Sequence, residues 1–106
     1  MIDPADLDRS LAHSLALGEA VADGRVVSGP GIGGRLLVWP AGHTRGDLGQ
    51  PRLNQRAALY AEALLDKIEG GKVPPSLRKS FAAVGGSAEV VFEFHRGNRH
   101  ADGETS

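Results

Sequence analysis

The sequence predicts an α+β fold, in which a single small domain combines a mixed sheet of about three or four strands with two main helices. Two stretches carry apolar residues at helical spacing, others carry strand-forming residues, and glycine- and proline-rich turns separate them. The chain has 106 residues, enough for one domain that buries roughly two-thirds of its unfolded surface. We expect residues 1–95 to form this domain and the polar, aperiodic residues 96–106 to form a disordered tail.

The first predicted helix begins at Asp3-Pro4 and ends at Gly18. Asp3 is a favourable N-cap, Pro4 suits the first helical position, and Gly18 suits the left-handed position that ends many helices. The apolar residues that recur every four positions and predict its buried stripe are Leu7, Leu11 and Leu15.

Two strands are predicted next. Val26 and Val27 favour a strand over residues 24–28, but Asp23-Gly24 is also a turn signal, so either one bulged strand or a hairpin fits this stretch. Residues 35–39 predict the central strand, because the consecutive apolar residues 36–38 are typical of burial on both faces. Pro40 ends it.

The second predicted helix begins near Asn54 and ends at Gly70-Gly71. Its apolar residues follow the spacing of one helical face and are Ala57, Ala61, Leu64, Leu65 and Ile68.

The last third of the domain predicts a short helix, a turn and a strand. After Pro74-Pro75, Ser76 is expected to cap a short helix that runs to about Ala83, and Gly85-Gly86 to form a turn. Residues 88–95 alternate between apolar and mainly polar side chains, which predicts a half-buried strand with an acidic outer face.

Composition excludes several function classes. A net charge of −1 argues against a nucleic-acid-binding protein, which normally carries a basic face. The chain has no cysteine, which excludes disulfides, thiolate nucleophiles and cysteine-based zinc sites. Neither a signal peptide nor an apolar run of the roughly 20 residues that span a bilayer is recognisable, so we expect a cytoplasmic protein.

The loop of residues 42–50 is the best candidate site. It is expected to connect a buried strand to a helix, the place where ligands bind in many α/β sheets and where helix N-termini attract anions. A solvated polar loop is the competing interpretation. The glycine run 29–34 leads into a strand rather than a helix, which favours a turn over a phosphate-binding loop. The candidate ligand-binding residues are His43, Thr44, Arg45, Gly46 and Gly49.

Catalytic and metal sites are not expected. His13, His95 and His100 share no metal-ligand spacing, and Glu89 and Glu93 are expected on a solvated strand face. No Ser/His/Asp arrangement is recognisable, so an enzyme acting through His43 and Asp47 on a small phosphorylated substrate is the weakest hypothesis.

The order of these segments resembles the N-terminal domain of the xanthine dehydrogenase accessory and carbon monoxide dehydrogenase maturation family (XdhC/CoxI). Residues 34–42 correspond to its G-x-x-L-L-V-x-P-x-G strand, of which residues 36–42 match the L-L-V-x-P-x-G part, and the similarity covers roughly residues 7–95. The chain lacks the cysteines of the family: Gly49-Gln50-Pro51 stands for a Gly-Gly-Cys-like tripeptide, and Val84 stands where a second motif carries cysteine. We therefore expect a degenerate relative without the C-terminal Rossmann-type domain of full-length members. The other segments that carry the resemblance are Gly18, Val26-Val27, Gly29-Pro30, 46–51 and 84–93.

The resemblance implies a non-catalytic binding protein, similar to a chaperone for maturation or insertion of the molybdenum cofactor (molybdopterin). Its partner would be a molybdenum hydroxylase-type enzyme or another assembly factor. The ligand would be bound by backbone amides of residues 46–49, with Arg45 as an anion partner. The alternative is an interaction or oligomerisation module without a ligand, in which residues 88–94 pair with a second copy in a homodimer if they lie at a sheet edge.

Overall fold

The computed structural model describes residues 4–68 and 75–96. The described elements confirm the predicted α+β class: two helices and five strands form one small domain. In chain order they are α1 (Pro4–Ala16), β1 (Ala20–Ser28), β2 (Arg35–Val38), β3 (Thr44–Asp47), α2 (Pro51–Ile68), β4 (Ser76–Ala83) and β5 (Gly86–Arg96).

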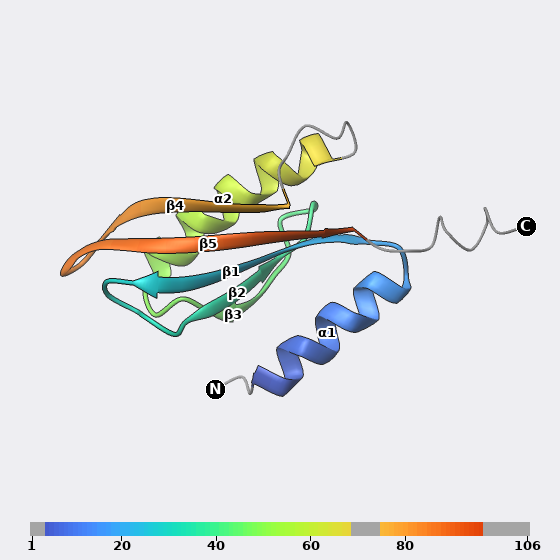
Figure 1. Ribbon diagram of the computed structural model, residues 1–106, viewed down its shortest axis with the longest axis horizontal. Helices are drawn as coiled ribbons and strands as arrows, with labels where there is room; N and C mark the ends of the chain where they lie inside the picture. The colour runs from blue at the N-terminus through green and yellow to red at the C-terminus, as the bar shows by residue number, and fades with distance from the viewer. Residues whose placement is uncertain (1–3, 69–74, 97–106) are drawn as a thin grey trace, which may run out of the picture.

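The strands form one sheet in the order β3-β2-β1-β5-β4, with β1 at its centre (Figure 1). All four strand pairs are antiparallel, whereas a mixed sheet was expected. The sheet has five strands rather than three or four, because two segments that the sequence assigned to other structures, β3 and β4, are its edge strands.

β1 runs unbroken through Asp23 and Gly24, which excludes a hairpin at this dipeptide. Asp23 is 1% exposed and is aligned with Glu93, and Gly24 is aligned with Phe92 of β5. A Cβ atom on Gly24 would lie 3.1 Å from the ring of Phe92, so the glycine leaves room for that ring. The irregularity expected in this strand is a register shift between Val26 and Ser28.

The expected short helix from Ser76 to Ala83 is wrong, because this segment is the edge strand β4. Phe81 and Ala83 pack against the core while Ser80 and Ala82 are exposed, which is the two-residue period of a strand, and Leu77 packs on the same face. The ring of Phe81 contacts Tyr60 of α2 and Phe92 of β5 at centroid distances of 5.8 and 6.1 Å. This aromatic packing fixes the segment to the sheet.

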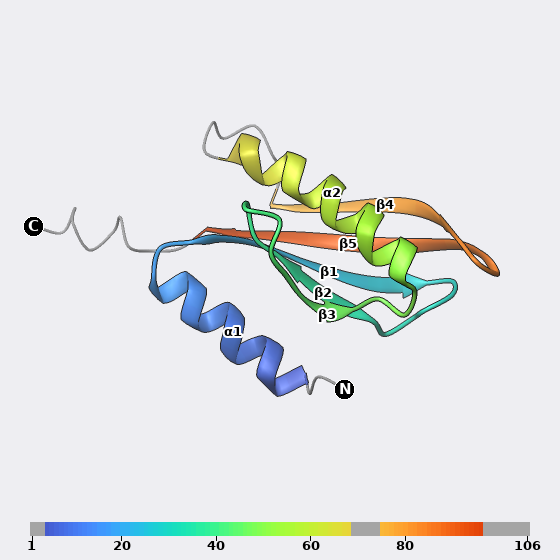
Figure 2. The ribbon, with the colours of Figure 1, turned by 180° about the vertical axis from the view of Figure 1, so that it is seen from behind.

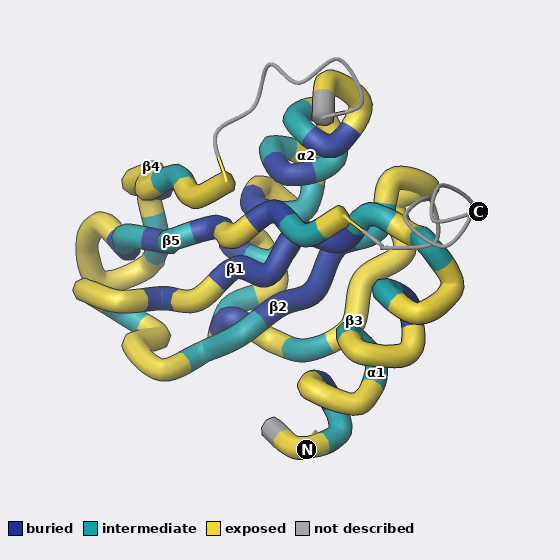
Figure 3. The backbone as a smooth tube through the Cα atoms, turned by 45° about the vertical axis from the view of Figure 1, so that its right-hand side comes forward, coloured by how far each residue is buried: buried dark blue, intermediate teal, exposed yellow. Residues whose placement is uncertain are grey.

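The helices lie on opposite faces of the sheet (Figures 1 and 2). Alternate residues of β1 show this, since Ala22 packs in the cluster with α2 and Val21 packs in the cluster with α1. Buried residues are concentrated along β1, β2 and β5, while each helix also carries many exposed residues (Figure 3). The buried residues that α2 contributes are Leu53, Ala57, Ala61 and Leu65. From α1, Leu7 is buried in the second cluster and the partly buried Leu11 packs against it.

The helix ends partly follow the expectations. Gly18 has a φ of 82°, as expected for a residue that ends a helix. The second helix begins at Pro51 rather than near Asn54, since proline is favourable in the first helical turn. The predicted cap Asp3, the helix end at Gly70-Gly71 and the tail 97–106 lie outside the described residues. Of the described helices, neither offers an apolar stretch long enough to cross a bilayer.

The predicted pairing of residues 88–94 with a second copy of the chain is wrong, because these residues do not lie at a sheet edge. β5 is an interior strand, bonded to β1 on one side and to β4 on the other, so it has no free edge for a second copy. Its predicted alternation is confirmed: the four residues that face α2, Ala88, Val90, Phe92 and Phe94, are all buried.

A buried ion pair joins β1 to β2, and its arginine also bonds to α1. The Nε and Nη2 atoms of Arg35 donate to the two carboxylate oxygens of Asp23 at 3.0 and 2.9 Å, and Nη1 donates to Asp8 at 2.7 Å. The side chains of Asp23 and Arg35 are only 1% and 13% exposed. The hydrogen bond to Asp23 is the main cause that raises the pKa of Arg35 above its ordinary value.

We predict that Arg35→Met lowers the free energy of unfolding by about 3–5 kcal/mol, because it leaves the buried Asp23 carboxylate without its main partner. Arg25→Met is the matched control: its side chain is 54% exposed and reaches Asp23 only at 3.4 Å, so the loss should stay below about 1 kcal/mol. Urea unfolding of the two variants measures both values. Equal losses would contradict a dominant Asp23–Arg35 pair.

Candidate functional site

The predicted ligand loop is largely a strand, and this divides its residues between the two faces of the sheet. Thr44 to Asp47 form β3, whose residues pair with β2 from Val38 to Arg35. Side chains alternate along a strand, so neighbouring candidates point in opposite directions. His43 and Arg45 lie toward α1, whereas Thr44 lies toward α2.

Residues 39–43 connect β2 to β3, and a backbone hydrogen bond between Trp39 and His43 closes a three-residue turn, Pro40-Ala41-Gly42. The amide of Gly42 donates to the carbonyl of Trp39, and the amide of Trp39 donates to the carbonyl of His43, both at 2.9 Å. Gly42 has a φ of 86°, which is the glycine geometry of three-residue hairpin loops. Proline followed two residues later by glycine was therefore a hairpin signal in the sequence.

A groove of about 460 Å³ lies between α1 and this hairpin. The hairpin contributes aromatic and basic side chains, α1 contributes hydroxyl, imidazole and apolar groups, and the turn after α1 contributes the carboxylate of Glu19. Its lining consists of Ser10, His13, Ser14, Leu17 and Glu19 from α1 and the turn after it, and Trp39, Ala41, His43 and Arg45 from the hairpin.

Trp39 is the centre of the groove wall. Its indole Nε1 donates to the hydroxyl oxygen of Ser14 at 2.9 Å, and this bond joins the hairpin to α1. The ring centroids of Trp39 and His43 lie 5.1 Å apart with their planes tilted by 53°. Ser14 is 5% exposed, and its hydroxyl anchors Trp39 in the groove wall.

Thr44 lines a different hollow, of about 350 Å³, on the α2 side. Its other lining residues are Gly42, Asn54, Gln55, Ala58, Leu59 and Glu62. The sheet separates this hollow from the groove, so Thr44 does not join His43 and Arg45 in one site.

Gly46 has a role in strand packing. Its φ is 112°, and a Cβ atom at this position would lie 2.3 Å from the carbonyl oxygen of Arg35. β3 therefore approaches β2 more closely than a side chain at residue 46 permits.

The backbone amides after β3 are already engaged. The carboxylate of Asp47 accepts hydrogen bonds from the Gly49 amide at 2.7 Å and from the Asn54 side chain at 3.0 Å. The Leu48 amide donates to the Asn54 side-chain oxygen at 2.7 Å. The Asn54 bond is the main cause, and the Gly49 bond the second, of a pKa of Asp47 below its ordinary value. The Leu48 and Gly49 amides are therefore not free to bind an anion.

Two loops that are distant in sequence meet beside the start of α2. The side-chain amide of Gln50 donates to the carbonyl of Val84 at 3.0 Å and accepts from the amide of Val84 at 2.9 Å. This pair of bonds fixes the tip of the β4–β5 hairpin to the loop before α2.

The sequence did not identify the residues of α1 and β1 that complete the possible sites. His13 and Ser14 are brought to the hairpin by α1, a contact that helical periodicity cannot predict. Asp23 looked like part of a turn, although its place in an apolar stretch was a sign of burial. Three candidate metal-ligating side chains, Asp23, Glu93 and His95, come together on the α1 side of the sheet.

We predict that Gly46→Ala destabilises the fold by about 2 kcal/mol more than Gly33→Ala, because overpacking adds to backbone strain. Both glycines have positive φ, 112° and 92°, but a Cβ atom on Gly33 would have no neighbour within 4 Å. The pair therefore separates the steric clash from the strain. Thermal and urea unfolding measure the difference, and equal stabilities would show that β3 does not need the close approach.

We predict that Asp47→Asn makes stability less dependent on pH under acidic conditions. The pKa of Asp47 is lowered in the folded state, so its contribution is complete above the ordinary value of 3.8 and is lost as the pH falls through the lower, folded-state pKa. Urea unfolding at pH 7 and pH 2.5 should show a smaller loss for Asp47→Asn than for the wild type. Asp66→Asn, which removes a carboxylate of α2, is the control. If the wild type and Asp47→Asn lose the same stability between pH 7 and pH 2.5, Asp47 does not stabilise the folded state in this way.

Comparison with known proteins adds no relative: no protein-family model matches the chain, and neither the curated proteins nor the solved structures contain a match.

Proposed function

We propose that this chain is a non-catalytic binding protein that holds a planar, anionic heterocycle in the groove between α1 and the β2–β3 hairpin. The observation that carries this proposal is the convergence of Trp39, His43 and Arg45 on that groove. Two of these residues were predicted from the sequence as ligand-binding residues, and the third supplies an aromatic ring beside them.

The groove combines the two kinds of contact that such a ligand needs. Arg45 is exposed, and among the described residues no carboxylate lies within ion-pair distance of it. Its guanidinium is free to donate to a phosphate or carboxylate. Trp39 and His43 present ring surfaces on the same wall, and aromatic rings stack on planar heterocycles.

The resemblance to the XdhC/CoxI family makes the molybdenum cofactor the first candidate ligand, since molybdopterin combines a pterin ring with a phosphate. The contact between Gln50 and Val84 supports this resemblance. These residues belong to the two motifs in which family members carry cysteine, and the fold brings the motifs into hydrogen-bond contact. The proposed partner is a molybdenum hydroxylase or another assembly factor.

Binding without catalysis agrees with the chemistry of the groove. The hydroxyl of Ser14 accepts the Trp39 indole hydrogen and is nearly buried, which makes it an anchor and a poor nucleophile. His43 contacts the Trp39 ring. The alternative of an oligomerisation module has less support, because the strand expected to pair with a second copy, β5, is enclosed by β1 and β4.

We predict that Arg45→Ala weakens cofactor binding by roughly 10- to 100-fold, the effect of losing charge-assisted hydrogen bonds. The measurement is native mass spectrometry of the purified protein titrated, without oxygen, with molybdenum cofactor released from a molybdenum hydroxylase. Arg56→Ala, an exposed arginine on α2, is the matched control and should bind like the wild type.

Two outcomes would reject the proposal. One is a wild-type protein that stays free of ligand at every cofactor concentration. The other is binding that Arg45→Ala and Arg56→Ala weaken equally, which would indicate attraction by surface charge rather than a site in the groove.

A further inference from the structure

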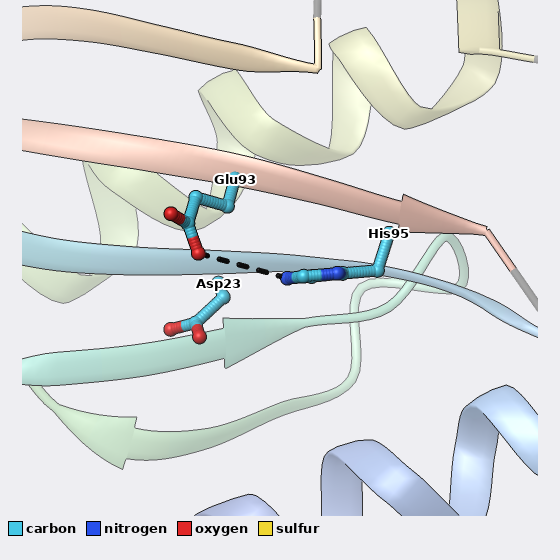
Figure 4. Close-up of side chains that lie close together, drawn as sticks. All are labelled: Asp23, Glu93 and His95. Carbon is cyan, nitrogen blue, oxygen red and sulfur yellow. Dashed lines mark ion pairs between the residues drawn. The ribbon is translucent and has the colours of Figure 1, made fainter.

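Glu93, His95 and Asp23 lie side by side on the sheet face opposite α2 (Figure 4). Glu93 and His95 are two residues apart in β5, so both side chains project from the same face. The register of β1 against β5 aligns Asp23 with Glu93 and Val21 with His95. Strand pairing thus brings a carboxylate of β1 to a carboxylate and an imidazole of β5.

The donor atoms of the three side chains all lie within 4.8 Å of one another. His95 Nε2 and Glu93 Oε1 lie 3.8 Å apart, which is too long for a hydrogen bond. His95 Nε2 is shielded from solvent and has no hydrogen-bond partner among the described residues. A shielded polar atom without a partner is costly, so this nitrogen is suited to a ligand that the protein chain itself does not supply.

From this geometry we propose that Asp23, Glu93 and His95 bind one divalent transition-metal ion of the zinc class. An imidazole nitrogen and two carboxylate oxygens are ligands that zinc accepts, whereas magnesium and calcium prefer oxygen ligands alone. Three protein ligands leave a fourth position of a tetrahedral ion for water or a small anion.

Asp23 can serve the metal without releasing Arg35. Each carboxylate oxygen has two lone pairs. Arg35 uses one on each oxygen, at 3.0 and 2.9 Å, and Arg25 reaches Oδ2 at 3.4 Å, so the second lone pair of Oδ1 is the one left for a metal ion. Arg35 would then act as an outer partner that fixes the orientation of a metal-binding carboxylate, a common arrangement around metal sites.

The local charge also suits a cation. The connected carboxylates are Asp8, Asp23 and Glu93, and the cations bonded to them are Arg25 and Arg35. With neutral His95, three negative and two positive charges leave one net negative charge. The positive charge of Arg35 is neutralised by the carboxylates of Asp8 and Asp23, so it does not repel a metal ion at this site.

Small side-chain rotations complete the coordination. Zinc bonds of about 2.0–2.2 Å in tetrahedral geometry place neighbouring ligand atoms roughly 3.3 Å apart, closer than in the metal-free arrangement. Glu93, whose side chain is 50% exposed, and His95, at 33%, have room to make this adjustment. The competing explanation is a weak ion pair between Glu93 and protonated His95.

The test is a zinc titration of the full chain, without a polyhistidine tag, against a chromophoric chelator at pH 7.5. We expect one zinc ion per chain and a loss of affinity of at least about tenfold in both His95→Gln and Glu93→Gln, since even outer-shell changes at metal sites have effects of this size. His100→Gln and Glu89→Gln are matched controls that should bind zinc like the wild type. Zinc should also raise the Tm of the wild type and leave that of His95→Gln unchanged.

Circular dichroism establishes that each variant is folded, and the exposed position of Glu93 makes Glu93→Gln the safer of the two. Absence of zinc binding by the wild type would overturn the proposal in favour of the ion pair. Zinc binding that survives both His95→Gln and Glu93→Gln, or that is lost in His100→Gln, would overturn it in favour of another location.

Discussion

The fold depends on one buried electrostatic contact, the bidentate ion pair between Arg35 and the carboxylate of Asp23. Asp23 lies in the central strand β1, Arg35 begins β2, and the same guanidinium reaches Asp8 on α1. A carboxylate that is 1% exposed requires a partner of opposite charge, so the three elements are held in one arrangement. This contact and the Trp39–Ser14 hydrogen bond together attach α1 to the sheet face opposite α2.

Both proposed sites are on that α1-bearing face, where the sheet is only partly covered. The α2 face is closed by a large apolar cluster that includes the rings of Phe81, Phe92 and Phe94. On the other face, the buried cluster in the described part of the chain is small and consists of Leu7, Val21 and Leu37. The two faces therefore differ in role. The α2 face supplies most of the apolar burial that stabilises the domain, and the α1 face retains polar groups that are available for ligands.

Much of the fold was predictable where the local pattern agreed with the tertiary environment. The apolar run 36–38, the alternation of 88–95 and the stripes of both helices correctly indicated β2, β5, α1 and α2. β3 and β4 were missed because edge strands bury few side chains: all four residues of β3 are polar or glycine, and in β4 only Phe81 is buried. The predicted ligand loop was divided because part of it is the strand β3, in which Thr44 and Arg45 point to opposite faces of the sheet. No local pattern could align Asp23 with Glu93, because register between distant strands is set by the whole core.

Trp39, the protein's single tryptophan, lines the groove in which we propose that the ligand binds, so occupation of the groove can be measured directly. The most direct measurement is the intrinsic tryptophan fluorescence of the wild type during titration with molybdenum cofactor under anaerobic conditions. Stacking of a pterin against or near the indole should quench the emission in a saturable manner, at the same concentrations at which mass spectrometry detects the complex. A complex that forms while the Trp39 emission stays unchanged would place the ligand elsewhere and contradict the account.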